Sequence, residues 1–418
     1  MTSGPGRLDP RRITRREIVV TAAFLLALTG IFVAVAVLSY KALWPEESNP
    51  QSDLPPLALV GPEQTVFDHT RDGCSPTDIP DAAARAFRDA DGRVHLIASH
   101  YVTRAMVGPS LDTVRHDCHQ VMASDFDADP ANFADREWLT SPYTTDGRTV
   151  YALVHEEYQG YNHPGRCTSK VPLDCWYNSI TLARSTDGGR TFTHAPPPRH
   201  LVAAVPYRYE PGLKPYGLFQ PSNINYRSVD GYYYTLIQAE AFHEQHAGTC
   251  VMRTTTLDRP DSWRAWDGRA FSVRFVNPYR ENGVGGHVCA PVSFPEIAKM
   301  TGSLTYNTYL EKYVLVSPSA QEIPGKRGPT WGFYYSTSDD LIHWEPRRLI
   351  REAVLTSSYR CGDPNPVGYP SLLDPESTSR NFETTGERPW LYFTRFHYEQ
   401  CRNVPNRDLV RVRVRFSR

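Results

Sequence analysis

Apolar runs along this sequence repeatedly end in ionisable or amide side chains. The polar residues at these ends are His100, His155, Glu156, Glu157, Gln238, Glu240, Ser317, Ser319, Arg395 and His397. Polar residues that open the preceding runs are Asp81, Tyr143, Gln220, Ser222, Thr305 and Tyr369. Carboxyl groups can perform acid–base catalysis when one is held protonated and another stays ionised. The candidate catalytic residues are Asp81, Glu157 and Glu240, and the candidate ligand-binding residues are His100, Tyr143, His155, Glu156, Gln220, Gln238, Arg395 and His397.

Hairpins would bring these polar residues together. Three pairs of runs are joined by Asp91-Gly92, Asp146-Gly147 and Asp230-Gly231, and Asp-Gly between apolar runs is a strong hairpin signal. The expected hairpins cover residues 81–100, 141–157, 220–240 and 303–319, and a fifth pairs the run from Tyr369 with residues 390–397. In a hairpin, the start of the first strand and the end of the second strand lie at the same rim. A ring of such hairpins would therefore gather the polar residues around one pocket.

A turn pattern repeats after the hairpins. An Asp is followed five positions later by an aromatic residue in three places, which are Asp187 with Phe192, Asp258 with Trp263, and Asp339 with Trp344. The Asp side chain accepts hydrogen bonds from the N–H groups of its own turn, and the aromatic ring packs into the layer below. These three Asp residues are predicted to cap turns and are given no catalytic role.

Five hairpin-led units predict an all-β fold, and their length fits the blades of a five-bladed β-propeller. The 24 Tyr, 17 Phe, 35 Pro and 27 Gly residues fit many short strands joined by turns. The last unit ends in Leu409–Phe416, where Val or Phe alternates with Arg as in a strand with one solvated face. The segment near Thr65 to Asp68 is expected to add a strand to this unit and close the ring. The propeller is predicted to cover residues 63–418.

The residues before the propeller differ in composition. Residues 1–17 are basic, residues 18–40 carry no charge and are long enough to cross a bilayer as one helix, and residues 41–62 are typical of a stalk. The arginine excess before the apolar segment keeps that end in the cytoplasm. These features predict a single-pass membrane protein whose propeller is extracytoplasmic. Ala34-Val35-Ala36 leaves a cleaved signal peptide as the alternative.

All eight cysteines follow the apolar segment, which indicates disulfides in an oxidising compartment. Pairing in chain order gives Cys74–Cys118, Cys167–Cys175, Cys250–Cys289 and Cys361–Cys401. No Cys-x-x-Cys pair or Cys/His ligand spacing supports a zinc site. His116 and His119 flank Cys118, where a loop at a disulfide is favoured over a metal site. The formal net charge of −1 gives no basis for nucleic-acid binding.

The five units, and turns such as Ser336–Trp344, resemble the five-bladed propeller glycoside hydrolases that cut arabinan, xylan and fructan. The turn Ser185–Phe192 is similar to the Asp-box of sialidases. The resemblance implies that an Asp opening the first blade acts as base or nucleophile, and Asp81 occupies that place. The second Asp of the family is met here by Ser141-Pro142-Tyr143, and its acidic Glu by Gln220-Pro221.

Two functions remain open from the sequence. In the first, the chain hydrolyses a cell-envelope or extracellular glycan, and Glu157 or Glu240 supplies the acid that the family motif lacks here. In the second, the same pocket binds a surface glycan or a protein without catalysis. Structural roles are also open, with Asp81 as a turn cap and Glu156 or Glu157 as a solvated strand end. The expected partners are a glycan and the membrane. No cofactor is expected, and a structural calcium ion is compatible with the sequence.

Overall fold

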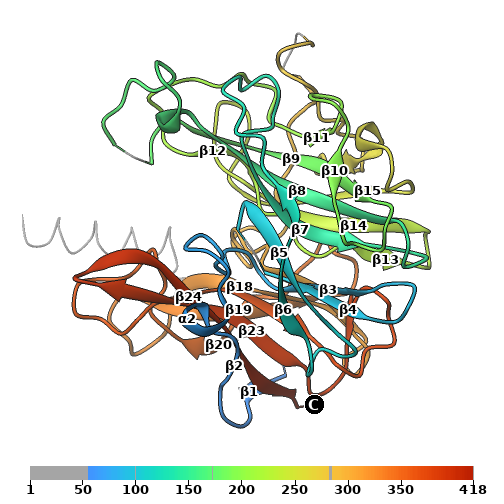
Figure 1. Ribbon diagram of the computed structural model, residues 1–418, viewed down its shortest axis with the longest axis vertical. Helices are drawn as coiled ribbons and strands as arrows, with labels where there is room; N and C mark the ends of the chain where they lie inside the picture. Colours follow the sequence, from blue (N-terminus) through green and yellow to red (C-terminus); the bar gives the residue numbers. More distant parts are fainter. Residues whose placement is uncertain (1–54, 99, 172, 282–284, 418) are drawn as a thin grey trace, which may run out of the picture. The chain divides into compact units, whose positions relative to one another are not determined.

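The computed structural model describes residues 55–417 except 99, 172 and 282–284, and its strands form four sheets (Figure 1). The strands divide into five units, here called blades, because one ten-stranded sheet contains two blades joined by the parallel pair of residues 216–217 with residues 177–178. Blade 1 consists of β3 (Arg85–Arg88), β4 (Val94–Ile97), β5 (Val102–Gly108) and β6 (Arg115–Ala123). Blade 2 consists of β7 (Arg136–Tyr143), β8 (Val150–Gln159), β9 (Trp176–Ser185), β10 (Thr193–His194) and β11 (Leu201–Ala203). Blade 3 consists of β12 (Tyr216–Phe219), β13 (Asn225–Arg227), β14 (Tyr232–Ala239), β15 (Gly248–Thr254) and β16 (Arg264–Ala265).

The remaining strands form two further blades. Blade 4 consists of β17 (Ser303–Asn307), β18 (Lys312–Glu322), β19 (Pro329–Ser338) and β20 (Arg348–Glu352), with β22 (Thr384–Thr385) parallel to β17. Blade 5 consists of β21 (Val367–Leu373), β23 (Trp390–Glu399) and β24 (Arg402–Phe416), joined by β1 (Leu57–Leu59) and β2 (Gln64–Phe67). Helical structure in the described residues is short and consists of α2 (His69–Asp72), η1 (Gly160–Asn162) and η2 (Pro260–Ser262).

The blades follow one another in a closed cycle. One hydrophobic core lies between each pair of consecutive blades, and pairs of residues that share a core are Phe87 with Val154, Ile180 with Ile237, Leu236 with Leu315, Phe333 with Phe393, and Leu96 with Tyr392. The last of these cores joins blade 5 back to blade 1. The first strands also meet in order, since β3 contacts β7, β13 contacts β17, β17 contacts β21 and β21 contacts β3. This cyclic order is that of a five-bladed β-propeller.

Strands from the two ends of the described chain close the ring. In β2, Thr65 pairs with Val410 of β24, which confirms the strand expected near residues 65–68. In β1, Leu57 pairs with Phe416 of β24 and is buried. Blade 5 therefore takes up residues from the end of the segment that was expected to be a stalk. The pairing covers backbone groups of β24 that would otherwise be a free sheet edge.

The Asp-Gly turns lie where the sequence predicts them. Gly147, between β7 and β8, has φ +75°, and a Cβ there would lie 2.4 Å from the backbone N of Ala90. Only glycine fits this left-handed position against the neighbouring blade. The strand before this turn is longer than expected, because β7 begins at Arg136 and not at Ser141, with a register shift between Leu139 and Ser141.

The repeated Asp turns are confirmed in one copy and corrected in two. Asp187 accepts hydrogen bonds from the backbone N–H groups of Arg190 and Thr191, and Phe192 is buried. In the third copy, the cap is Asp340, which accepts from Ile342 and His343, and not the exposed Asp339, which pairs with Lys312. In the second copy, Asp258 is exposed, and hydroxyl groups of Thr254 and Ser262 bond one another and the turn backbone instead. The aromatic residues Trp263 and Trp344 are buried as predicted.

All four predicted disulfides are present: Cys74–Cys118, Cys167–Cys175, Cys250–Cys289 and Cys361–Cys401. Four disulfides fit an extracellular protein. The predicted basic tail (1–17), the membrane-crossing segment (18–40) and the stalk up to residue 54 lie outside the described residues. Within the described residues, no helix combines the length and the apolar character needed to cross a bilayer.

Candidate functional site

A small cavity lies where the first strands of the blades meet, and it is here called the inner cavity. Its volume is about 40 Å³, which is room for a few water molecules. Residues from all five blades line it: Asp81, Ala82, Ala83, Arg85, Trp138, Thr140, His155, Glu157, Gln220, Pro221, Thr301, Gly302 and Tyr369. The structure brings Asp81, His155, Glu157 and Gln220 together in this cavity, as the hairpins predict.

A wider depression adjoins the inner cavity and is here called the outer cleft. Its volume is about 620 Å³, within the range of ligand-binding clefts. The two share the lining residues Ala83, Gln220, Thr301, Gly302 and Tyr369. Gln238, Lys299, Phe294 and Phe396 line only the outer cleft. The outer cleft therefore has room for a ligand, and the inner cavity has room for only a small part of one.

Asp81 is oriented by contacts with side chains from three blades. Its Oδ1 accepts a hydrogen bond from the Tyr369 hydroxyl at 3.1 Å and forms an ion pair with Arg407. Its Oδ2 accepts from Trp138 Nε1 at 3.2 Å and lies 3.3 Å from His100 Nε2. The side chain is 12% exposed, so these contacts are made largely out of water. The Asp81 carboxylate is therefore fixed in one orientation, with Arg407 balancing its charge.

Glu157 is a buried carboxyl group that keeps its proton. Burial raises its pKa from the usual 4.5 to about 8, against a hydrogen bond from Gln159 Nε2 at 2.7 Å and with a further upward push from the Asp81 charge. Its Oε1 lies 3.6 Å from Nδ1 of His155. The other ring nitrogen of His155, Nε2, donates to Asn178 Oδ1 at 3.1 Å, so Nδ1 carries the lone pair. Glu157 is thus mostly protonated at neutral pH.

The two predicted histidines near this carboxyl pair are neutral. Burial lowers the pKa of His155 to about 4. Burial also lowers the pKa of His100 to about 4, although the Asp81 charge opposes this. Neither imidazole carries a charge at neutral pH, and both contribute hydrogen-bonding nitrogens only. The ion pair of Asp81 with Arg407 is therefore formed without a charged histidine beside it.

Glu156 and Glu240 lie outside the inner cavity. Successive residues of a strand point to opposite faces, so Glu156 turns away from Glu157, and its Oε2 accepts from Ser179 Oγ at 2.6 Å. Burial holds the pKa of Glu156 well above its usual range. Glu240 accepts from Gln238 Nε2 at 2.8 Å and forms an ion pair with Lys299 at 2.6 Å. Since both partners of Glu240 line the outer cleft, this carboxylate lies at the edge of that cleft.

Three further predicted ligand-binding residues are not brought to either hollow. Tyr143 is the last residue of β7, and its hydroxyl donates to Glu383 at 3.1 Å. Arg395 pairs with Glu63, and His397 Nε2 lies 2.8 Å from Asp408. In blade 5 the neighbouring residue Phe396 lines the outer cleft instead. Successive residues of β23 face opposite sides of the sheet, so Phe396 faces the outer cleft and Arg395 faces away from it.

Arg85, Trp138 and Arg407 contact the site and were not predicted there. Tyr369, one of the strand-start residues expected at the central pocket, lines the inner cavity. Arg85 is buried, donates to the carbonyl of Gly302 in blade 4, and has its pKa lowered to about 9 by burial. Arg407 belongs to the long β23–β24 hairpin, and no spacing in the sequence places it beside Asp81.

The buried proton on Glu157 links stability to pH. In the unfolded chain the group would titrate near 4.5, and in the folded chain near 8. Its stabilising contribution is complete below about pH 4.5 and is lost as the pH rises to about 8, because the unfolded state releases the proton first. Glu157→Gln cannot titrate, so its melting temperature relative to wild type is expected to rise between about pH 5 and about pH 8. Parallel curves of melting temperature against pH for the two proteins would contradict a buried proton.

Comparison with known proteins gives distant structural matches only. No protein-family model matches the sequence, and no curated protein matches it. A xylan β-1,4-xylosidase from Bacillus halodurans C-125 matches with 10% identity and a TM-score of 0.43, over 81% of this chain and 54% of that chain. An α-L-arabinanase from Cellvibrio cellulosa matches with 10% identity and a TM-score of 0.43, over 79% and 90%. The catalytic domain of a Coprinopsis cinerea GH62 α-L-arabinofuranosidase matches with 9% identity and a TM-score of 0.42, over 87% and 98%.

Proposed function

We propose that this chain is a glycoside hydrolase whose two working carboxyl groups are Glu157 and Asp81. The observation that carries the proposal is their contrast within one cavity. Glu157 is buried and keeps its proton, with its pKa raised to about 8, while Asp81 is a carboxylate paired with Arg407. Cleavage of a glycosidic bond requires such a pair, one carboxyl group to protonate the leaving oxygen and one carboxylate on the sugar side.

The roles follow from the contacts of each group. Glu157 would donate its proton to the glycosidic oxygen as the bond to the sugar carbon breaks, and its new negative charge would face the positive charge that develops on the sugar. The Asp81 carboxylate, fixed by Trp138 and Tyr369, would stabilise that positive charge or accept a proton from the attacking water. His155 would position the Glu157 side chain. Because His155 is neutral, it would not form an ion pair that favours loss of the Glu157 proton. The inner cavity has room for the water and for one edge of a sugar ring, and the rest of the glycan would lie in the outer cleft.

The compartment belongs to the same proposal. Four disulfides support an extracytoplasmic location, and the uncharged segment 18–40 supports an anchor in the cell membrane. A hydrolase held at the membrane would meet polymers of the cell envelope. We therefore propose an envelope or extracellular glycan, with a furanoside polymer as the first candidate because of the resemblance noted from the sequence.

Release of sugar by the purified full chain tests this function. Detergent-solubilised protein would be incubated with a panel of envelope and plant polysaccharides, and new reducing ends and products would be separated by chromatography. The double variant Asp81→Asn/Glu157→Gln serves as the blank for contaminating enzymes. Product formed by the wild type and absent with the double variant supports the proposal. Equal release by both proteins, or no release from any polymer, contradicts it.

The pH profile of the reaction is a separate prediction. Because Glu157 must carry its proton to act as the acid, kcat/KM is expected to fall as the pH rises through about 8. A tenfold loss per pH unit above this value is about the limit for one deprotonation. Initial rates at low substrate concentration, measured from about pH 5 to about pH 10, would show this alkaline decrease in kcat/KM. Activity that persists undiminished at the alkaline end would remove Glu157 from the role of acid.

One observation favours a second function, binding of a glycan without catalysis. The Asp81 oxygens are already engaged by Tyr369, Arg407 and Trp138, and Gln220 presents an amide to both hollows. A carboxylate with this many partners has few lone pairs left for a water molecule or a sugar. If the wild type binds a polysaccharide in a gel-shift assay and releases no sugar from it, and the double variant binds equally, the chain is a glycan-binding propeller.

A further inference from the structure

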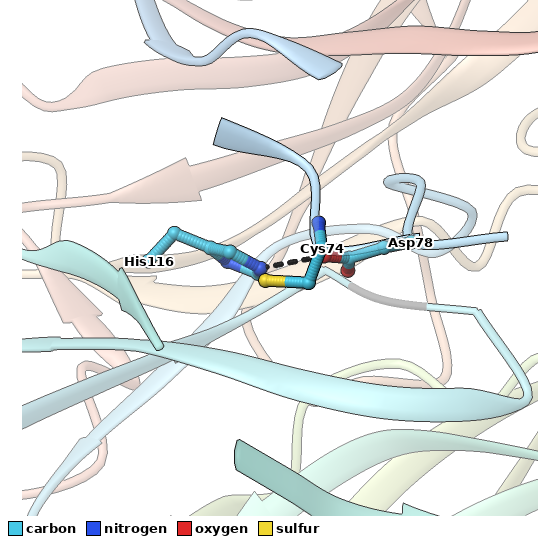
Figure 2. Close-up of side chains that lie close together, drawn as sticks. All are labelled: Cys74, Asp78 and His116. Atoms are coloured by element: carbon cyan, nitrogen blue, oxygen red, sulfur yellow. Dashed lines mark hydrogen bonds and ion pairs between the residues drawn. The ribbon is translucent and has the colours of Figure 1, made fainter. Parts of the chain in front are cut away.

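Two groups of potential metal ligands occur in the described residues, and they differ in how they are satisfied. Figure 2 shows the first, Cys74, Asp78 and His116, lying close together. The sulfur of Cys74 is bonded to Cys118, and Asp78 Oδ2 already accepts from the Cys74 backbone N at 2.9 Å and lies 2.7 Å from His116 Nε2. These atoms hold one another, so the group stabilises the disulfide loop and is not available to an ion.

The second group, here called the Glu137 cluster, consists of Glu137, His194 and His200. Their ligand atoms all lie within 4.8 Å of one another. Glu137 is on β7, His194 ends β10, and His200 directly precedes β11, so the strands of blade 2 bring them together. Glu137 and His200 are fully buried, and the His194 side chain is 13% exposed. The cluster lies outside both hollows of the candidate active site.

Backbone carbonyls orient both histidines. Nδ1 of His194 contacts the carbonyl oxygen of Ala195 at 2.9 Å, and Nε2 of His200 contacts that of Phe133 at 2.9 Å. A carbonyl oxygen can only accept, so these nitrogens carry the protons. The lone pairs then lie on Nε2 of His194 and Nδ1 of His200. A ring nitrogen bound to a metal is typically accompanied by a second ring N–H that donates to a carbonyl or carboxylate, which is the arrangement of both residues.

The cluster gathers acceptors without a donor. Both carboxyl oxygens of Glu137 and Nδ1 of His200 are buried. None of these three atoms has a hydrogen-bond partner among the residues that the structure describes. His194 Nε2 lies 3.7 Å from Glu137 Oε1 and 3.4 Å from Asp125 Oδ2. The backbone of Asp125 also faces the Glu137 carboxyl group, without reaching full hydrogen-bond geometry. Buried polar atoms are normally paired, so these atoms call for a partner between them that donates a hydrogen bond or carries a positive charge.

We propose that the Glu137 cluster binds a divalent transition-metal ion of the zinc class through Glu137, His194 and His200, with Asp125 as a further ligand. Two imidazole nitrogens and carboxylate oxygens suit Zn²⁺, whereas Ca²⁺ and Mg²⁺ prefer oxygen ligands alone. The Asp125 side chain is 54% exposed, so the ion would enter from that side. Asp125 follows β6 of blade 1, so the ion would join blade 1 to blade 2.

Metal binding by the purified full chain tests the proposal. The protein would be prepared without a polyhistidine tag, stripped with a chelator, and equilibrated with Zn²⁺ at a low micromolar concentration. After desalting, elemental analysis is expected to find about one Zn²⁺ per chain. Glu137→Gln and His200→Gln are each expected to weaken binding by about 10-fold or more, and His116→Gln, in the other cluster, is expected to leave it unchanged. Near-ultraviolet circular dichroism would establish that each variant is folded.

A second measurement needs no variant. Co²⁺ in place of Zn²⁺ is expected to give a visible absorption spectrum of a site with few, mixed nitrogen and oxygen ligands, different from that of hydrated Co²⁺, and Zn²⁺ would abolish it. Retention of less than a tenth of an equivalent of Zn²⁺, or a Co²⁺ spectrum equal to that of the free ion, would overturn the proposal. Binding lost in His116→Gln and kept in Glu137→Gln would overturn it as well.

Discussion

Replacing Glu157 by Gln is expected to lower kcat/KM for glycan hydrolysis by about 10²–10⁴-fold, the usual contribution of a general acid. Gln has nearly the same shape and keeps the contact with Gln159, but it has no proton of suitable acidity for the leaving oxygen. Substrate affinity is expected to change little, because the outer cleft, which would hold most of the glycan, remains intact. Initial rates on the polymer identified in the screen, for the purified variant and wild type, measure the loss.

The adjacent residue provides the matched control. Glu156 is also a buried carboxyl group with a raised pKa, but it faces Ser179 on the other side of β8. Glu156→Gln makes the same chemical change one residue away and is expected to keep kcat/KM within a few-fold of wild type. An equal loss in the two variants would indicate damage to β8 rather than removal of an acid, and no loss in Glu157→Gln would refute its catalytic role.

Replacing Arg407 by Met is expected to lower the free energy of unfolding by about 3–5 kcal/mol, because it leaves the Asp81 carboxylate buried without its ionic partner. The two side chains are 11% and 12% exposed and connect β24 of blade 5 to the segment that opens blade 1. Met retains much of the Arg407 packing over the Phe396 ring. The shift of the urea unfolding midpoint, with the slope of the transition, measures the change.

A second substitution separates the charge from the packing. In Asp81→Asn/Arg407→Met no unpaired charge remains, so the double variant is expected to be more stable than Arg407→Met alone. Equal stabilities of these two variants would show that the loss comes from packing. If Arg407→Met unfolds at the same urea concentration as wild type, the hydrogen bonds from Trp138 and Tyr369 are sufficient to stabilise the buried Asp81 carboxylate, and the prediction is wrong.

Local patterns were sufficient for the elements that depend on neighbours in sequence. Asp-Gly pairs located the hairpins, and the rule that a hairpin returns to its own rim brought Asp81, His155, Glu157 and Gln220 to one cavity. Cysteine order gave all four disulfides. The turn pattern located the buried aromatic residues, but it misassigned the cap by one residue at Asp340, because Ser338 and not Thr337 begins that turn.

Other features depend on geometry that the sequence does not show. Tyr143 was misplaced because β7 starts earlier than its apolar run suggests and shifts register near Thr140. Arg395 was chosen over Phe396 because polarity alone does not reveal which face of β23 turns to the ring centre. The contact of Arg407 with Asp81 joins the two ends of the described chain, and only the closed ring brings these residues together. Glu137 meets His194 and His200 through the pairing of the strands of blade 2, and no spacing in the sequence shows that contact.

The pairing of β1 and β2 with β24 has a consequence for biosynthesis. The earliest of the described strands finds its partner only after the last of them has been synthesised, so blade 5 cannot be completed before β24 has emerged. A product that stops before β24 would expose the edge of β23 and leave two neighbouring cores half covered. Such unfinished chains would be substrates for proteolysis and chaperones, which gives the cell a direct way to tell complete molecules from incomplete ones.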